Sequence, residues 1–422
     1  MSTAGPIARS KNNALINLRL LLGLLAVLWL LGGCDSPAIA EPAPPAAVSQ
    51  PAAAVAEPTD TPLASATALP APEDKKWVAD FAAYIQDAQE ENSIPGLSLA
   101  VVNGDGPLLV EGYGLRDVEK NLPVDGDTLF HIGSTHKSMT ALLVATLVDA
   151  GVVEWDTPVV EIDPDFALAE DDASETVTFR HLLSMTSGIP DDAEEALPRS
   201  PSVDDVFAVA GEAELLGAPG EVFSYSNISS SLAGYLAALA AGSDFDTVHA
   251  SYARLLRERL LDPLGMETAT VYASEARQNP NHSLAYDTSG GDAEALESED
   301  RDDDALAPSG SLKASAREMG LYMQMLVNRG MARDGTRIVS EESLAEMWTP
   351  LLEEYGLGWE IVQADGLRLV SHTGAFDGFV SVIGLLPEAG VGFVLLVNAE
   401  EGGGDLTEAA AQAFAKFYSQ SH

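Results

Sequence analysis

Four apolar segments near the C-terminal end of the chain constrain its fold most. Each is short, rich in aliphatic and aromatic residues, and separated from the next by only two or three residues. Segments of this kind are typical of β-strands, and such short connections favour antiparallel neighbours. The sequence therefore predicts four successive strands over residues 355–363, 367–374, 378–387 and 390–398.

Matching elements occur at the other end of the domain. Apolar residues at helical spacing predict a helix over residues 75–92, with Trp77, Phe81, Tyr84 and Ile85 on one face. Two further strands joined by a short turn follow, and a helix ends the chain (96–103, 106–114 and 406–418). The segment between, about 140–310, is mostly helical in pattern. We expect an α/β (α+β) fold in which an antiparallel sheet, assembled from both ends and flanked by helices, carries an inserted, mostly helical lobe.

The first 75 residues do not read as part of that domain. A basic start and an apolar run over 20–31 are typical of a signal peptide, and the run is short for a membrane span. It ends in Leu-Gly-Gly-Cys, which resembles the lipobox of bacterial lipoproteins. This implies a lipoprotein signal peptide over 1–33, a lipidated Cys34 anchored in a membrane, and an envelope location on the periplasmic face, or secretion. An uncleaved signal anchor is the alternative.

Residues 34–75 are dominated by Pro and Ala and predict an extended tether, so the folded domain is expected over 76–422. The chain carries 22 basic and 65 acidic residues, a net charge of −43. Such a charge repels nucleic acid and excludes it as a partner. It fits either a protein from a saline habitat or an ordinary acidic secreted protein. Cys34 is the single cysteine, so an intrachain disulfide is excluded.

Ser134 and Lys137 are the first candidate catalytic pair. Residues three apart share a helix face, so the hydroxyl and the amine can meet. The apolar run that follows can bury the amine and lower its pKa until it acts as a base. Of seven lysines, Lys137 alone has a serine three residues before it. A four-residue pattern also arises by coincidence, which is the alternative here.

Two further strings occur later in the chain: Tyr225-Ser226-Asn227 and His372-Thr373-Gly374. Three motifs in this order resemble the serine hydrolases related to class C β-lactamases, D-alanyl-D-alanine carboxypeptidases and family VIII-type esterases, and the resemblance spans about residues 76–420. The segments 176–190, 260–272, 307–326 and 355–359 support the same resemblance.

The resemblance implies a role for each residue. Ser134 is the expected nucleophile, Lys137 the base or proton carrier, and Tyr225 the phenol that passes a proton to the leaving group. Asn227 is expected to position Lys137 and the substrate carbonyl. The backbone N–H groups of Ser134 and Ala375 are expected to form the oxyanion hole.

The third motif departs from true β-lactamases, which usually carry lysine where this chain has His372. A neutral histidine offers a hydrogen bond rather than a charge. We expect His372, Thr373 and Gly374 to bind substrate along the strand edge. The sequence thus predicts a serine hydrolase that acts through a Ser134 acyl-enzyme on small ester or amide (D-amino-acid peptide-like) substrates. A true β-lactamase or penicillin-binding carboxypeptidase, and a non-catalytic envelope scaffold, are the alternatives.

Other candidate residues have simpler interpretations. His181 is expected to be structural, and His136 to line the pocket. The acidic run over 292–304 is expected to be a solvated insertion loop rather than a calcium site. Metal-binding and α/β-hydrolase motifs are missing from the sequence, so no metal and no cofactor is predicted. The sequence does not indicate an oligomeric state.

Overall fold

The computed structural model describes residues 72–298 and 300–422. The predicted signal peptide, Cys34 and nearly all of the predicted tether lie outside the described residues. The first helix, α1 (Pro72–Glu91), begins three residues before the predicted start. Among the described residues, no helix has the length and apolar character needed to cross a membrane.

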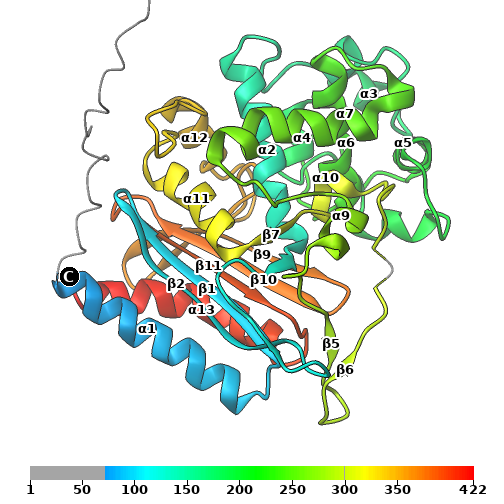
Figure 1. Cartoon of the computed structure of the whole chain (residues 1–422). Coiled ribbons are helices and arrows are strands. Elements are labelled where there is room, and N and C mark those ends of the chain that lie inside the picture. The colour runs from blue at the N-terminus through cyan, green and yellow to red at the C-terminus, as the bar shows by residue number, and fades with distance from the viewer. Residues whose placement is uncertain (1–71, 299) are drawn as a thin grey trace, which may run out of the picture. The chain divides into compact units, whose positions relative to one another are not determined.

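A seven-stranded antiparallel sheet is the centre of the domain (Figure 1). Its strand order is β3-β2-β1-β11-β10-β9-β8. β1 pairs with β11, so the N-terminal hairpin and the C-terminal strands form one sheet, as the sequence predicts. The strands are β1 (Gly96–Asn103), β2 (Gly106–Asp117), β3 (Leu122–Pro123), β8 (Glu360–Ala364), β9 (Leu367–Phe376), β10 (Phe379–Leu386) and β11 (Val391–Val397).

The other elements of the described part lie mostly between β3 and β8. They are β4 (Leu129–His131), η1 (Gly133–Thr135), α2 (His136–Asp149), η2 (Val159–Glu161), α3 (Asp171–Thr176), α4 (Phe179–Leu183), η3 (Asp191–Ala196), α5 (Val203–Glu212), α6 (Asn227–Ala240), η4 (Phe245–Thr247), α7 (Val248–Leu256), η5 (Arg257–Leu261), α8 (Asp262–Leu264), α9 (Ala273–Gln278), β5 (Tyr286–Asp287), β6 (Glu294–Ala295), α10 (Ala307–Gly310), β7 (Lys313–Ser315), α11 (Ala316–Val327), α12 (Glu341–Met347) and, after the sheet, α13 (Gly403–Ser419).

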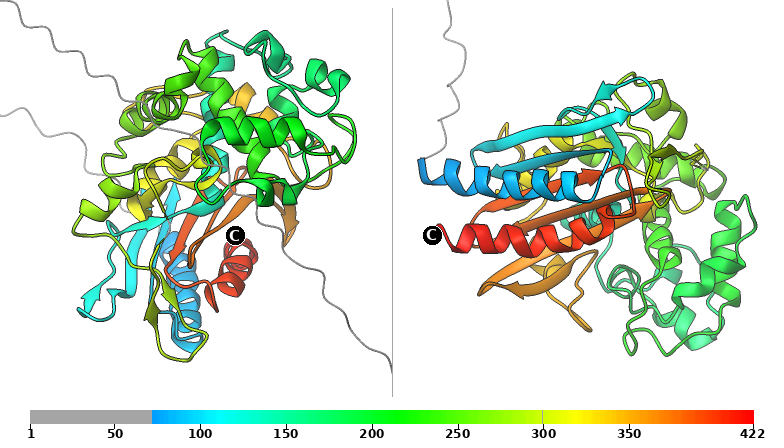
Figure 2. Two further views of the ribbon diagram at one scale, coloured as in Figure 1. Left: turned by 90° about the vertical axis from the view of Figure 1, so that its right-hand side faces the viewer. Right: turned by 90° about the horizontal axis from the view of Figure 1, so that it is seen from below.

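The terminal helices α1 and α13 cover one face of the sheet, side by side (Figure 2). Trp77 and Phe81 of α1 contact Phe414 of α13 edge-on, with ring centroids 5.6 and 5.5 Å apart. Leu97 and Leu99, alternate residues of β1, are fully buried in the same apolar cluster. Side chains two apart on a strand share a face, so β1 can bury both of its faces.

The opposite face of the sheet carries α11 and the helical lobe. Ala100 and Val102, on the other face of β1, belong to the second apolar cluster, which extends through α2, α6 and α7. Helix α2 is buried from His136 to Leu147, because it runs through the middle of this cluster. A helix that is apolar on all sides belongs in a core. The start of α2 is therefore held firmly by its surroundings.

The first predicted C-terminal strand is only partly correct. Strand β8 begins at Glu360, and residues 355–359 form a loop instead. Gly358 has a positive φ of 74°, and a Cβ there would lie 2.8 Å from the carbonyl oxygen of Lys137. The loop therefore bends to pack against α2, which an extended strand could not do.

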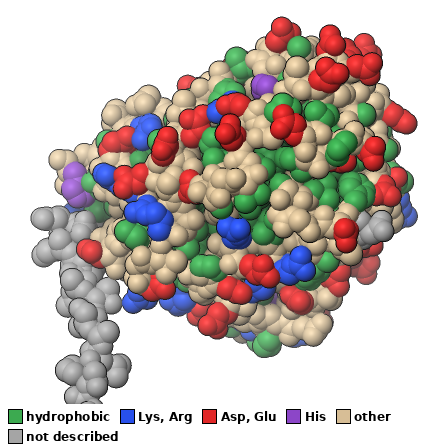
Figure 3. All heavy atoms as spheres, turned by 90° about the horizontal axis from the view of Figure 1, so that it is seen from above, with side chains coloured by type: hydrophobic (Ala, Val, Ile, Leu, Met, Phe, Trp, Pro, Cys, Tyr) green, Lys and Arg blue, Asp and Glu red, His purple; other side chains and the backbone are tan. Residues whose placement is uncertain are grey.

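Acidic side chains are spread over the face shown in Figure 3 rather than gathered in one patch.

The expectation of a solvated loop over 292–304 is wrong for one residue, Asp300. Asp300 forms an ion pair of 2.7 Å with Lys313, and the two side chains are only 7% and 5% exposed. Within the described part, which omits residue 299, no three His, Cys, Asp or Glu side chains lie close enough to hold a metal ion.

Candidate active site

Ser134 lies in a single 3₁₀ turn, η1, between the end of β4 and the start of α2. The sequence suggests an α-helical start here, and the structure places α2 two residues later, at His136. Gly133 makes the tight entry possible. Its φ is +53°, and a Cβ there would lie 2.6 Å from the backbone nitrogen of Ala375. The turn therefore presses against β9, with the half-buried Ser134 at the edge of a cavity.

The predicted catalytic residues meet at Lys137. Its Nζ lies 2.9 Å from Ser134 Oγ, 2.6 Å from Asn227 Oδ1 and 3.0 Å from the backbone oxygen of Ser309. It also sits 4.8 Å from the ring centroid of Tyr225. Asn227 begins α6 and Ser309 belongs to α10, so three separate elements hold one amine.

Burial suits Lys137 to act as a base. The side chain is 1% exposed, and desolvation lowers its pKa to about 7, against an upward pull from the carboxylate of Glu194. A neutral amine has two N–H donors and one lone pair. The donors match Asn227 Oδ1 and the Ser309 carbonyl, because neither oxygen can donate. The lone pair is then left for the hydroxyl proton of Ser134, as general-base catalysis requires.

Tyr225 is better suited to giving a proton than to taking one. Burial raises the pKa of its phenol, and Glu360 and Glu194 raise it further, although a hydrogen bond with Ser134 opposes them. The phenol therefore stays protonated at neutral pH. Its place beside Ser134 agrees with the predicted transfer of a proton to the leaving group.

Two glycines bring the expected oxyanion donors together. A Cβ on Gly374 would clash with the Ile132 carbonyl and would lie 2.9 Å from the backbone nitrogen of Ser134. Gly374 is therefore needed because η1 lies directly against β9. The backbone nitrogens of Ser134 and Ala375 lie at this contact, where two N–H groups could stabilise an oxyanion.

Comparison with known proteins identifies the chain. A family model described as Beta-lactamase matches residues 81–416. The chain belongs to the beta-lactamase family. Its members are serine hydrolases, as the sequence motifs suggested. The chain is 31% identical to penicillin-binding protein 4 of Amycolatopsis lactamdurans over 326 residues, which cover 73% of this chain and 82% of that protein.

Two further proteins are similar to this chain over most of its length. Protein flp of Staphylococcus aureus (strain N315) is 28% identical over 74% of this chain, which spans 61% of the length of flp. The structure of the octameric penicillin-binding protein homologue from Pyrococcus abyssi is 26% identical, with a TM-score of 0.69 over 81% of this chain and 77% of that one. The predicted family and fold class are thereby confirmed.

This beta-lactamase family member places His372 differently from our expectation. The side chain is 2% exposed; Nε2 lies 2.9 Å from the hydroxyl of Tyr355, and Nδ1 lies 2.6 Å from the Thr373 carbonyl. A carbonyl only accepts, so Nδ1 carries the proton and Nε2 accepts from Tyr355. Burial lowers the pKa of His372 to about 4. Both nitrogens are engaged, so His372 is not free to bind substrate, and the half-buried Thr373 uses its carbonyl to hold it.

His136 and His181, the two other histidines considered in the sequence, form their hydrogen bonds away from Ser134. His136 is fully buried, with Nε2 3.1 Å from the Tyr252 hydroxyl, because its position on α2 points into the lobe. The expectation that it lines the pocket is wrong. His181 is structural, as predicted: it forms a capping box with Thr178 at the start of α4.

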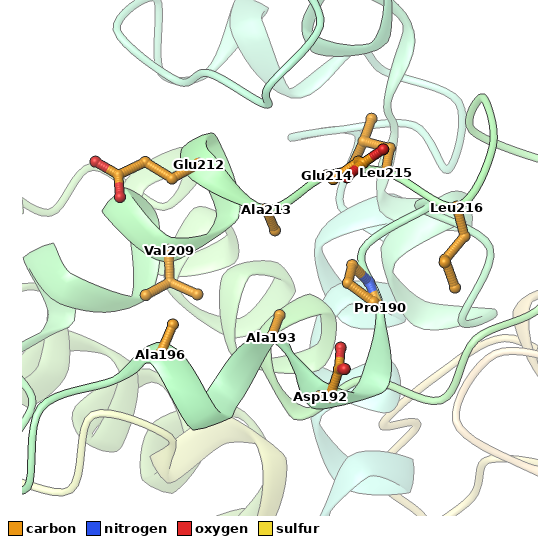
Figure 4. A pocket seen from close by; sticks show the side chains of 10 residues that line it. All are labelled: Pro190, Asp192, Ala193, Ala196, Val209, Glu212, Ala213, Glu214, Leu215 and Leu216. Carbon is orange, nitrogen blue, oxygen red and sulfur yellow. The ribbon is translucent and has the colours of Figure 1, made fainter. Parts of the chain in front are cut away.

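Sequence reasoning missed Glu194. Asn227 Nδ2 donates to Glu194 Oε2 over 2.7 Å, so this carboxylate fixes which way the amide of Asn227 faces. Glu194 lies on η3, a short 3₁₀ helix whose residues line two cavities. Ala193 and Ala196 of η3 point into an outer cavity of about 640 Å³, which Figure 4 shows, while Glu194 lines the one at Ser134.

The cavity at Ser134 has a volume of about 480 Å³. Carboxylates line it on two sides, from η3 and from the segment before α10, and no Lys or Arg of the described residues lines it. The acidic residues are Glu194, Glu195 and Asp304. Negative potential near the nucleophile disfavours anionic substrates.

We expect Glu194→Gln to shift the pH dependence of the enzyme towards acid. Removing the carboxylate removes the influence that raises the pKa of Lys137, while the glutamine oxygen can still accept from Asn227. The rise of kcat/KM with pH should move down by roughly one unit or less, because a single charge at the cavity edge is partly screened. Stopped-flow assays of a neutral p-nitrophenyl ester from pH 5 to 9 would measure it.

Glu195→Gln is the matched control for this experiment. Glu195 lines the same cavity but forms no hydrogen bond with Asn227. Its profile should move less than that of Glu194→Gln. Equal shifts in both variants, or none in Glu194→Gln, would contradict a specific role for Glu194.

Proposed function

We propose that this chain hydrolyses small esters or amides through a Ser134 acyl-enzyme, with preference for uncharged or cationic acyl groups. The single observation that carries this proposal is the 2.9 Å approach of Ser134 Oγ to the buried Lys137 amine, whose pKa is lowered to about 7. A non-catalytic scaffold has no need to bury a lysine in this way, since burying an amine costs stability.

The proposed reaction has two halves. Lys137 takes the hydroxyl proton as Ser134 Oγ attacks the carbonyl carbon, and the N–H groups of Ser134 and Ala375 stabilise the oxyanion. The bond to the leaving group then breaks. Tyr225 gives that group a proton, and the Lys137 ammonium restores the phenol. A water molecule attacks the acyl-enzyme in the same way and releases the acid and free Ser134.

The charge of the cavity limits the substrate. Penicillins and peptides that end in D-alanine carry a carboxylate, whereas the cavity presents Glu194, Glu195 and Asp304. His372 cannot offset them, because it is neutral and engaged with Tyr355. The chemistry therefore favours esters and amides with a neutral or protonated amine group over β-lactams.

We also propose that Cys34 is lipidated and tethers the enzyme to the bacterial envelope. The support is the Leu-Gly-Gly-Cys sequence after the apolar run 20–31 and the Pro/Ala-rich tether that follows. Metabolic labelling with an alkyne fatty acid would test this, with Cys34→Ser as the negative control. Label that persists in Cys34→Ser would contradict it.

A set of matched substrates would test the proposed specificity. D-alanine p-nitroanilide, its N-acetyl form and its N-succinyl form differ at one end in charge: positive, neutral and negative. We expect kcat/KM to fall by about tenfold from the positive to the neutral substrate and by about tenfold again to the negative one. This is the effect of a unit charge at several ångströms in a partly hydrated site. Intact mass after rapid quenching should show an acyl adduct on Ser134.

Two results would contradict the proposal. Faster turnover of the succinyl form, or of a chromogenic cephalosporin, would favour a β-lactamase or carboxypeptidase. Silence with every substrate, and no adduct, would favour the scaffold. The purified full chain in detergent is suitable for both measurements.

A further inference from the structure

A third cavity, of about 200 Å³, is lined by His131, which comes two residues before Gly133 of the catalytic turn. β4, β7, α9 and the start of β10 enclose it, and Ser134 is not among its lining residues. Its walls are largely apolar, with Leu129 and Phe130 on one side and Phe379 on another. It is smaller than the ~300–1,000 Å³ of sites for drug-sized ligands, so it suits a small molecule.

His131 brings an unused hydrogen-bond donor to this cavity. Its Nδ1 accepts from the Gly133 N–H over 3.1 Å, so the proton of the neutral ring is on Nε2. Nε2 is buried and has no partner among the described residues. Burial, with Lys313 and His136 nearby, holds the pKa of His131 well below its usual range, so the ring is neutral. An unsatisfied buried donor is costly unless something accepts from it.

Cationic side chains line the same cavity. Lys313 is paired with Asp300 at 2.7 Å, and Arg277 donates through Nη1 to the backbone oxygen of Asp300. Among the described residues, two cations and one carboxylate line the cavity. Burial lowers the pKa of Lys313 and Asp304 raises it, and Lys313 and Arg277 lower the pKa of Asp302, so further carboxylates lie close by. Two cations in one cavity are notable in a chain with 22 basic and 65 acidic residues.

We propose that this third cavity binds a small monocarboxylate with a short hydrocarbon chain. The carboxylate accepts from His131 Nε2 on the side of Lys313 and Arg277, and the chain lies against Leu129, Phe130 and Phe379. Leu296 marks the entrance: it lines the cavity and is 40% exposed, which is rare for a large apolar side chain in the described part. Neither the contacts of the carboxylate nor those of the hydrocarbon chain involve Ser134, so the proposed site does not depend on the proposed function.

The ring of His131 also lies between this cavity and the cavity at Ser134. It stacks on Phe376 at 3.8 Å with an interplanar angle of 3°, and Phe376 lines the cavity at Ser134. A carboxylate on Nε2 would hold this ring, and with it Gly133 and Phe376, in one position. A bound acid is therefore expected to change kcat rather than KM. Carboxylic acids are also what an ester or amide hydrolase releases.

Titration of the full chain with hexanoate, followed by calorimetry, would test the site. We expect saturable binding of one equivalent, at least about tenfold weaker for hexanamide, which has the same shape without the charge. Binding should persist after Ser134 is blocked with a phosphonate. Competition between the two ligands would overturn the proposal.

Two variants and one control locate the binding. Ala276→Leu fills the cavity and should abolish binding. Leu296→Glu adds a like charge at the entrance and should weaken binding about fivefold or more, while the exposed Val152→Glu, which does not line the cavity, should leave it unchanged. Equal affinity in the last two variants, or no binding to the native chain, would overturn the proposal and leave water as the partner of His131.

Discussion

Ser134→Ala is expected to lower kcat/KM for a p-nitrophenyl ester by about 10⁴-fold or more, since loss of a nucleophile removes the covalent route entirely. The acyl adduct should disappear from the mass spectrum at the same time. The fold should be unaffected, because the side chain is half-buried at a cavity edge and alanine leaves the turn Gly133–Thr135 intact. Thermal unfolding would confirm this.

Ser138→Ala is the matched control. Ser138 lies one helical turn further along α2, is fully buried, and donates to the Thr135 carbonyl over 2.7 Å. It contacts none of the proposed reacting groups, so its loss should cost stability and leave kcat/KM within a fewfold of native. An active Ser134→Ala, or an equal loss of activity in Ser138→Ala, would contradict the assignment of Ser134 as nucleophile.

Strand patterns at the two ends of the domain were readable because they are local. The three strands β9, β10 and β11 lie within two residues of their predicted bounds. The predicted strand over 355–363 was wrong at its start because long-range packing decides it: Gly358 approaches the Lys137 carbonyl, a contact that strand propensity does not contain. Similarly, the burial of Asp300 depends on Lys313, which lies outside the acidic run.

Site residues that belong to a sequence motif could be predicted. Contacts that only the folded chain creates could not. Ser134, Lys137 and Asn227 meet as the motifs imply. Glu194 has no motif, since it reaches Asn227 from a short turn in the lobe. His372 matches its motif in sequence, but Tyr355 and the Thr373 carbonyl engage both of its ring nitrogens, contacts that the motif does not contain.

Lys137→Met is expected to lower kcat/KM by about 10²–10⁴-fold, the usual contribution of a general base. The pH profile makes the assignment specific. The native enzyme needs the free amine, so its kcat/KM should rise through about pH 7 and level off above it. At pH 5 the free amine is roughly 1% of the total, so the native rate should be about a hundredfold below its plateau.

Tyr225→Phe separates the two candidate bases. Burial keeps the Tyr225 phenol protonated, so its loss should slow the leaving-group step but leave the rise through about pH 7 in place. Lys137→Met should abolish that rise, because Lys137 is the group in contact with Ser134 Oγ whose pKa is lowered to about 7. If the rise survives in Lys137→Met and vanishes in Tyr225→Phe, the phenol is the base and the role assigned here to Lys137 is wrong.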